Sequence, residues 1–339
     1  MKISYIILLS NLFYTLVLFL VWCLMVFKWL DFKITNRCNN NCLYCGNQDP
    51  PDKPEKVPSK RIINTLVDAL ELGFTHFAFL GGEPSIRKNV EQLFTPLKDH
   101  GKDVQSVMAI TNMHVFNEKL FRAVYESRSN HAQIVASIDS LKEPNYKNQK
   151  VKQTQSFLEK IQEISNEYQN HGLREVHVHS VISRENLASI YDHVKFFDRK
   201  NIQVSLALVE PYKIIKKPSK YNEFSPSEFE LILKQLDSLE QDNILNWANQ
   251  VLRNYLTEYI MSGNQNRFDC TAGRNHVIIE SDGYVYPCLT EAYRRGLQFG
   301  NIIQGDFKDI YTKMVEFKCK SDHQQTCWDH YLWTELDKL

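Results

Sequence analysis

Three cysteines, Cys38, Cys42 and Cys45, lie within eight residues and constrain this chain more than any other feature. Three thiolates this close in sequence can ligate three irons of a cubic iron–sulfur cluster and leave the fourth iron without a protein ligand. Clusters that only carry electrons usually have four cysteine ligands. Zinc is the alternative, but zinc sites usually have four ligands, often as two Cys-x-x-Cys pairs, and the chain has one such pair, Cys42 and Cys45. The triplet therefore predicts a cluster with one iron open to a substrate.

The composition is that of a packed globular protein without an excess of either charge. The chain has 339 residues, of which 43% are hydrophobic and 12% aromatic, with 40 basic and 40 acidic side chains. Nucleic-acid-binding proteins normally show a basic excess, so no nucleic-acid partner is expected. Seven of the eight cysteines fall in two groups, which indicates metal ligation in a reducing compartment. The second group is Cys270, Cys288, Cys319 and Cys327.

The N-terminal segment is long and apolar. Ile3–Phe27 contains no charged residue. As a helix it would be about 37 Å long, which exceeds the roughly 30 Å of a bilayer core. We therefore predict a single-pass membrane anchor over residues 1–29, with the membrane as a partner and the rest of the chain in the cytoplasm, because more basic residues follow the segment than precede it. If translation starts at Met25, the protein would instead be soluble and cytoplasmic.

Short apolar runs then alternate with longer amphipathic stretches, the pattern of an α/β fold with a parallel sheet. The predicted strands are Phe32–Thr35, His76–Leu80, Val107–Thr111, Gln133–Ile138, Glu175–Ile182 and Gln203–Val209. The predicted helices are Ser59–Leu72, Val90–Asp99, Asn117–Ser127, Lys152–His171, Leu187–Arg199 and, after a lysine- and proline-rich boundary loop, Ser227–Met261.

Polar and glycine residues follow several of these strands. Gly81, Gly82 and Glu83 end the second strand, and the two glycines would let the backbone approach a ligand closely. The alternative is an ordinary strand-to-helix turn with an exposed acid. Ser137 and Asp139, two residues apart, share a face of the fourth strand, and they could equally cap the next helix.

The cysteine spacing, followed 36 residues later by Gly81-Gly82-Glu83-Pro84, resembles the radical S-adenosylmethionine (radical SAM) superfamily. The resemblance covers most of Phe32–Tyr212. It implies a partial (β/α)6 barrel with its active site at the carboxyl ends of the strands. It also implies that the triplet holds a [4Fe–4S] cluster to which S-adenosylmethionine (SAM) binds.

The resemblance also assigns roles to single residues. Tyr44 would lie near the adenine of SAM, and Gly81, Gly82 and Glu83 would hold its amino group. Positions similar to Asn112, Ser137 and Asp139 contact the ribose and the methionine carboxylate. His179 would lie near the cofactor or the substrate, although His177 and His179, which share a face, could also ligate a metal or face solvent.

The C-terminal cysteines resemble the auxiliary-cluster domains of many radical SAM enzymes, called twitch domains with one extra cluster and SPASM domains with two. Val277–Glu280 and Tyr284–Pro287 flank the turn Ser281-Asp282-Gly283 and predict a β-hairpin that presents Cys288. Four cysteines suffice for one auxiliary [4Fe–4S] cluster, and a structural zinc at the same thiolates is the alternative. The predicted organisation is an anchor (1–29), a partial-barrel core (30–215), a helical linker (216–265) and a small cysteine-rich, twitch-like domain (266–339).

The resemblance implies the following function. A low-potential donor such as flavodoxin or ferredoxin reduces the cluster, SAM is cleaved, and the 5′-deoxyadenosyl radical abstracts a hydrogen from a peptide, small-molecule or lipid substrate. The enzyme would be an oxidoreductase or maturase. One alternative is a GTP 3′,8-cyclase of molybdopterin synthesis, although the chain ends Asp337-Lys338-Leu339 where that family usually has two glycines. Another is a non-catalytic, zinc-binding membrane scaffold.

Overall fold

The computed structural model describes residues 27–42, 45, 49–100, 103–141, 151–209, 224–262, 272–294 and 296–317. Within these residues the strands form one nine-stranded sheet in the order β6-β5-β4-β3-β2-β1-β7-β8-β9. The first six strands are parallel to their neighbours and match the six predicted ones. They are β1 (Trp29–Thr35), β2 (His76–Gly81), β3 (Ser106–Thr111), β4 (His131–Ser137), β5 (Leu173–Ile182) and β6 (Gln203–Leu208).

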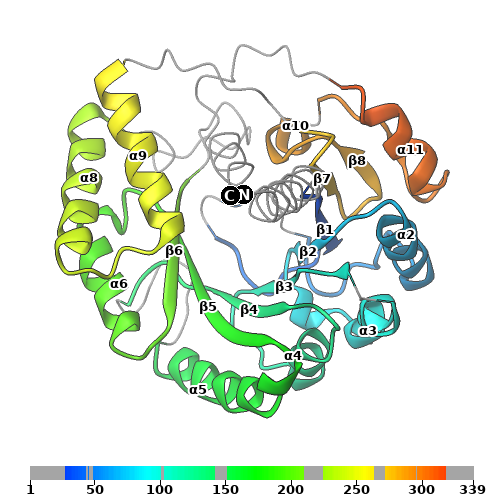
Figure 1. Ribbon diagram of the computed structural model, residues 1–339, viewed down its shortest axis with the longest axis horizontal. Helices are drawn as coiled ribbons and strands as arrows, with labels where there is room; N and C mark the ends of the chain where they lie inside the picture. The colour runs from blue at the N-terminus through cyan, green and yellow to red at the C-terminus, as the bar shows by residue number, and fades with distance from the viewer. Residues whose placement is uncertain are drawn as a thin grey trace, which may run out of the picture.

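Helices cover the outside of the curved sheet (Figure 1). They are α2 (Ser59–Glu71), α3 (Thr95–Asp99), α4 (Glu118–Tyr125), α5 (Val151–Glu167), α6 (Ile190–Asp198), α8 (Pro226–Gln241), α9 (Trp247–Ser262), α10 (Leu289–Arg294) and α11 (Phe307–Met314). Short 3₁₀ turns are η1 (Pro84–Ile86), η2 (Val90–Phe94), η4 (Gln169–His171) and η5 (Leu187–Ser189).

Two predicted helices differ from the structure. Residues 90–99 form η2 followed by α3, with Pro96 in the first turn of α3, where its missing N–H costs nothing. The predicted helix over 227–261 is two helices, because the chain breaks after α8, where Asn243 adopts a φ of 58°. A left-handed residue at this point is a common way for a helix to end.

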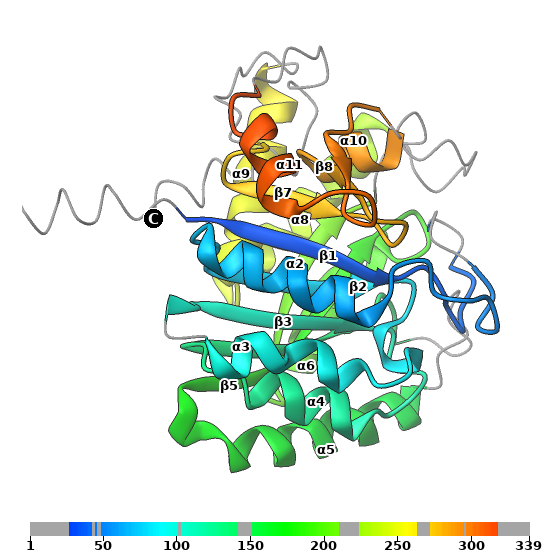
Figure 2. The same cartoon turned by 90° about the vertical axis from the view of Figure 1, so that its right-hand side faces the viewer.

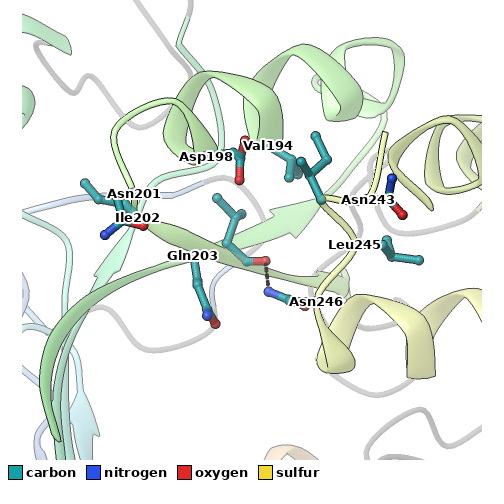
Figure 3. A pocket seen from close by; sticks show the side chains of 10 residues that line it. Val194, Asp198, Asn201, Ile202, Gln203, Asn243, Leu245 and Asn246 are labelled. Carbon is teal, nitrogen blue, oxygen red and sulfur yellow. Dashed lines mark hydrogen bonds between the residues drawn. The ribbon is translucent and has the colours of Figure 1, made fainter. Parts of the chain in front are cut away.

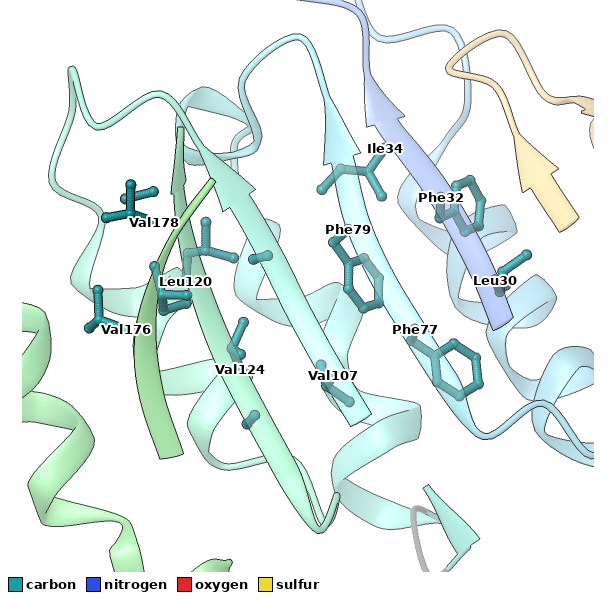
Figure 4. Packing of buried hydrophobic residues seen from close by; sticks show 14 of the residues in the cluster. Leu30, Phe32, Ile34, Phe77, Phe79, Val107, Leu120, Val124, Val176 and Val178 are labelled. Carbon is teal, nitrogen blue, oxygen red and sulfur yellow. The ribbon is translucent and has the colours of Figure 1, made fainter. Parts of the chain in front are cut away.

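The alternation of side chains along the strands separates an apolar outer face from a polar inner face. Leu30, Phe32 and Ile34 of β1 point outward into the core beneath the helices, as do Val176 and Val178 of β5 (Figure 4). The residues between them, such as Lys33 and His177, point to the inner face of the barrel. This face carries most of the polar groups described below.

The predicted hairpin is confirmed, but it joins the barrel sheet. β7 (His276–Ile279) pairs antiparallel with β8 (Tyr284–Tyr286), which pairs with β9 (Gly300–Asn301). β7 also lies parallel to β1, with Trp29 opposite His276. The C-terminal cysteine-rich region therefore continues the sheet of the barrel core within the described residues, and its predicted boundary at residue 266 stays a prediction.

The opposite edge of the sheet, β6, is covered by side-chain amides from α9 and from Asn246, the residue directly before it. Asn249 is fully buried; its Oδ1 accepts a hydrogen bond from the Leu206 amide at 2.8 Å, and its Nδ2 donates to the Val204 carbonyl at 2.8 Å. Asn246 donates a second bond to the same carbonyl at 2.7 Å. These bonds occupy backbone groups that an open edge strand would otherwise expose.

The predicted membrane anchor, residues 1–29, lies outside the described residues except for its last three. Of those three, Trp29 begins β1. Among the helices that are described, none combines the length and apolarity needed to cross a bilayer. The predicted membrane localisation and membrane partner gain no support from this part of the chain.

Candidate functional site

The cysteine triplet occupies a loop that begins where β1 ends (Figure 2). Two backbone hydrogen bonds close the base of this loop: Cys38 N donates to Asp49 O at 2.9 Å, and Asp49 N donates to Asn36 O at 3.0 Å. Cys45 N donates to Cys42 O at 3.2 Å. Cys38, Cys42 and Cys45 are half-buried and form no disulfide. We call residues 36–49 the cysteine loop.

The surroundings of Cys38 suit a metal-bound thiolate. Burial raises the pKa of the Cys38 thiol, and the charges of Glu83 and Cys45 also raise it, whereas hydrogen bonds from Asn40 and Asn112 lower it. The Asn40 amide lies 3.4 Å from Cys38 Sγ, and Asn112 Nδ2 lies 3.7 Å from it. A bound cation would favour the thiolate, and N–H groups directed at cysteine sulfur are characteristic of iron–sulfur sites. Three cysteines outside any disulfide, together with these donors, therefore fit a cluster.

No three His, Cys, Asp or Glu side chains within the described ranges converge closely enough to hold a single metal ion. A cubic cluster does not require such convergence, because each cysteine ligates a different iron.

Gly81 and Gly82 pack directly against the cysteine loop. Gly82 N donates to Thr35 O at 2.7 Å, and Glu83 N donates to Arg37 O at 2.8 Å. A Cβ atom on Gly81 would lie 2.1 Å from Thr35 O, and one on Gly82 would lie 2.2 Å from Arg37 O. The glycines are thus required for a close approach to the protein's own backbone, next to the first cysteine.

Glu83 differs from its predicted role. Its side chain is fully buried and its carboxylate faces the protein. Oε1 accepts hydrogen bonds from Ser85 N at 2.9 Å and Thr111 Oγ1 at 2.8 Å, and Oε2 accepts one from Asn112 N at 2.6 Å. Burial raises the pKa of Glu83, and these donors oppose the rise. The carboxylate therefore joins the ends of β2 and β3, and this geometry does not expose it to a ligand's ammonium group.

Asn112 links β3 to the cysteine loop. Besides approaching Cys38, its Nδ2 donates to Asn39 Oδ1 at 2.8 Å, and its Oδ1 accepts from His114 N at 3.0 Å. Cys38 and His114 also line an open hollow of about 690 Å³, together with Asn39, Asn40, Asn41, Asp49, Pro50 and Pro51. Asn112 therefore joins β3 to the cysteine loop, and its contact with SAM stays a prediction.

The other predicted contacts lie on β4 and β5. Asp139 is buried, and its Oδ1 accepts a hydrogen bond from Val181 N at 2.8 Å, so it joins the two strands. Ser137 is the register partner of His179, which is the register partner of Ser205 on β6. His179 Nδ1 and Ser205 Oγ are 2.9 Å apart. Ser205 is not among the predicted site residues. The alternation of polar and apolar residues along β6 would have placed it on the same face as His179.

The inner face also carries charged and titratable groups. Lys33 Nζ and Glu280 Oε1 form an ion pair of 2.5 Å with side chains only 2% and 3% exposed. His131 Nε2 lies 3.0 Å from Glu175 Oε1. Burial, helped by the charge of His179 and opposed by that of Glu175, lowers the pKa of His177 to about 4. The imidazole of His177 is therefore neutral at physiological pH.

A second hollow, of about 250 Å³, lies beside the amino end of β6 and the loop between α8 and α9 (Figure 3). Asp198, Asn201, Gln203, Asn243 and Asn246 supply its polar side chains. It is at the other end of the strand from the carboxyl ends where barrel enzymes react, so it is not part of this site.

Four predicted site residues lie outside the described residues: Tyr44, Cys270, Cys319 and Cys327. Cys288 is described, and it follows β8 as the hairpin prediction requires. Its thiol is half-buried and in no disulfide, and the Glu291 amide lies 3.5 Å from Sγ.

The comparison with protein families decides the identity. Residues 32–197 match the radical SAM superfamily, and residues 270–329 match the SPASM family, an iron–sulfur cluster-binding domain. The chain is a radical SAM protein with a SPASM/twitch-type domain at its C-terminus. It accordingly uses SAM and a [4Fe–4S] cluster, with auxiliary iron–sulfur chemistry in the C-terminal domain. The SPASM match spans all four C-terminal cysteines.

Sequence relatives and solved structures agree with this fold. A probable GTP 3′,8-cyclase of Sulfurisphaera tokodaii is 22% identical over 82% of this chain and 86% of its own. SuiB of Streptococcus suis bound to its precursor peptide SuiA has a TM-score of 0.64 at 15% identity, covering 91% of this chain and 71% of that one. The structure of anSMEcpe with bound SAM and the Cp18Cys peptide has a TM-score of 0.60 at 20% identity, covering 92% and 95%.

Proposed function

We infer that this radical SAM protein is an oxidoreductase or maturase that removes a hydrogen atom from a peptide substrate. When bound, the cluster supplies the electron that cleaves SAM. The cysteine loop carries the inference, because it begins at the carboxyl end of β1 and contains three cysteines that form no disulfide. It is hydrogen-bonded to the neighbouring strands: Arg37 O accepts from Glu83 N, and Asn39 Oδ1 accepts from Asn112 Nδ2. A low-potential protein such as flavodoxin or ferredoxin is the proposed donor of the electron.

The charges of the inner face support a peptide rather than a nucleoside triphosphate. On the described strands this face carries the carboxylates of Asp31, Glu175 and Glu280, and its one lysine, Lys33, is already paired with Glu280. A triphosphate needs cations, preferably arginines, to offset its charge. SuiB and anSMEcpe, which share the fold, are solved with peptides.

The proposed role of this chain's residues is orientation. The row formed by Ser137, His179 and Ser205 crosses the inner face of β4, β5 and β6 and offers hydroxyl and imidazole groups to SAM or to the substrate. The apolar side chains beneath the helices keep the sheet rigid, which holds such groups in a fixed geometry. Cys270, Cys288, Cys319 and Cys327 are the proposed ligands of one auxiliary cluster.

Reductive SAM cleavage tests the proposal. The protein is purified anaerobically, its clusters are reconstituted, and dithionite and SAM are added. We expect 5′-deoxyadenosine, measured by liquid chromatography and mass spectrometry. Cys42→Ala should abolish it, whereas Cys288→Ala should lose iron but still cleave SAM. A reconstituted wild-type protein that binds iron at the triplet and releases no 5′-deoxyadenosine would contradict the proposal.

The same preparation distinguishes a peptide-modifying enzyme from a GTP 3′,8-cyclase. GTP added with SAM and dithionite should not be consumed, because the described inner face offers no unpaired cation for its phosphates. Consumption of GTP with formation of a cyclised product would favour the cyclase function instead.

A further inference from the structure

We propose that Glu55 is a positioning residue for the cluster ligands. Its carboxylate lies between two arginines and fixes the segment after the cysteine loop against β1, the strand before that loop. The inference rests on the proposed function only in that the triplet must hold the catalytic cluster. Glu55 lies ten residues beyond Cys45, outside both the cysteine motif and the glycine turn.

The carboxylate of Glu55 contacts both sides of the loop base. Oε1 accepts a hydrogen bond from Thr35 Oγ1 at 3.1 Å and one from Arg37 Nη1 at 3.3 Å. Oε2 lies 3.2 Å from Arg87 Nη1. Thr35 is the last residue of β1, and Arg37 directly precedes Cys38. One carboxylate therefore joins the entrance of the loop to the segment after its exit.

Arg87 extends this network from the turn that follows Glu83. Its side chain is only 3% exposed. The guanidinium donates to the carbonyl of Ile34, to the carbonyl of Val57 at 3.0 Å and to Ser59 Oγ at 3.3 Å. Burial lowers the pKa of Arg87, the charge of Glu55 raises it, and the charge of Arg37 lowers it. Glu55 thus offsets the repulsion between two guanidiniums that both contact the base of the loop.

Loss of this charge would act on the thiols through Arg37. Arg37 O accepts the Glu83 amide, and Cys38 N and Asn36 O bond to Asp49 across the loop base. Without the Glu55 carboxylate, the guanidiniums of Arg37 and Arg87 would repel each other. Arg87 would keep its hydrogen bonds to Val57 and Ser59, whereas Arg37 would lose its bond to Glu55. The geometry around Cys38 would loosen, although no cluster ligand is removed.

The test uses the reconstituted full-length protein and the isosteric variant Glu55→Gln. The matched control is Glu71→Gln at the end of α2, away from the loop. It removes an exposed ion pair between Glu71 and Lys308. Iron loss to a ferrous chelator and the electron paramagnetic resonance spectrum of the reduced triplet cluster, with and without SAM, are measured beside the melting temperature. A residue that orients metal ligands typically changes metal affinity by about 10- to 100-fold, so we expect iron loss about tenfold faster in Glu55→Gln. The spectrum should also be altered, and Glu71→Gln should behave as the wild type.

A second variant, Arg37→Gln, covers the case in which Glu55→Gln does not fold, because it leaves the buried Arg87 paired with Glu55. It should show the same altered spectrum. If either folded variant has wild-type iron loss and a wild-type spectrum, the proposal is wrong, even if its melting temperature falls. If the wild type itself holds no cluster at the triplet, the proposed function fails first, and the experiment shows this separately.

Discussion

At the scale of single residues, the glycines and acids of the second strand have roles that their side-chain chemistry alone does not reveal. Gly81 and Gly82 admit the backbone carbonyls of Thr35 and Arg37, and Glu83 collects three donors from its own chain. The turn at residues 81–83 thereby holds the base of the cysteine loop in place. Its contact with SAM stays a prediction.

Gly82→Ala should displace the cysteine loop, because the new Cβ would lie 2.2 Å from Arg37 O and backbone must move. Overpacking of this kind costs about 1–3 kcal/mol of unfolding free energy. We expect that loss, together with less iron bound at the triplet after reconstitution. Gly305→Ala is the matched control, since nothing lies within 4 Å of a Cβ at that position. Equal iron contents in the two variants would refute this role.

His177 should make the stability depend on pH. Its pKa in the folded protein is about 4, below the ordinary value of about 6.5. The neutral imidazole therefore contributes its full stabilisation of the fold above pH 6.5. This contribution is lost progressively as the pH falls from 6.5 through 4. Linkage gives a loss of about 2 kcal/mol between neutral pH and pH 5. Urea unfolding at both pH values should show that His177→Gln removes this difference, whereas the exposed-site variant His100→Gln keeps it.

At the scale of elements, side-chain amides form the hydrogen bonds that the backbone of the edge strand β6 would otherwise lack. β6 ends the sheet, and Asn249 of α9 and Asn246, which directly precedes α9, bond to its backbone much as another strand would. The break between α8 and α9 makes this possible, because a continuous helix over 227–261 could not turn α9 onto β6. A single predicted helix over 227–261 gave no indication that α9 would cover the edge strand β6.

Asn249→Ala should leave the Leu206 amide buried without an acceptor, while the Val204 carbonyl keeps its bond from Asn246. An unsatisfied buried donor costs about 1–3 kcal/mol. We expect a destabilisation of that size in urea unfolding and faster hydrogen exchange at Leu206. Asn254→Ala, which changes an exposed asparagine of the same helix, should have little effect; a similar loss there would argue against the edge contact.

At the scale of the whole molecule, the C-terminal region is joined to the barrel through β1. β1, which leads into the cysteine loop, pairs with β2 on one side and with β7 on the other. Lys33 and Glu280 bridge this junction with a buried ion pair.

A double-mutant cycle tests this junction. Lys33→Met and Glu280→Leu should each cost about 3–5 kcal/mol, because each leaves one charge buried alone, whereas the double variant should be close to the wild type. The free energy of unfolding of all four proteins gives the coupling. Additive losses would mean that the two side chains do not depend on each other.

Local pattern in the amino-acid sequence was enough to determine the six strands, most helices and the hairpin, and the cysteine spacing was enough to indicate the radical SAM family. Periodicity and cysteine spacing are properties of contiguous segments, so they can be recognised before folding. The pairing of β7 with β1, the inward turn of Glu83, the contacts of Glu55 and the row through Ser205 were decided only by the tertiary structure. Each joins segments that are distant in the chain, and their hydrogen bonds and ion pairs depend on strand register and burial, which no single segment contains.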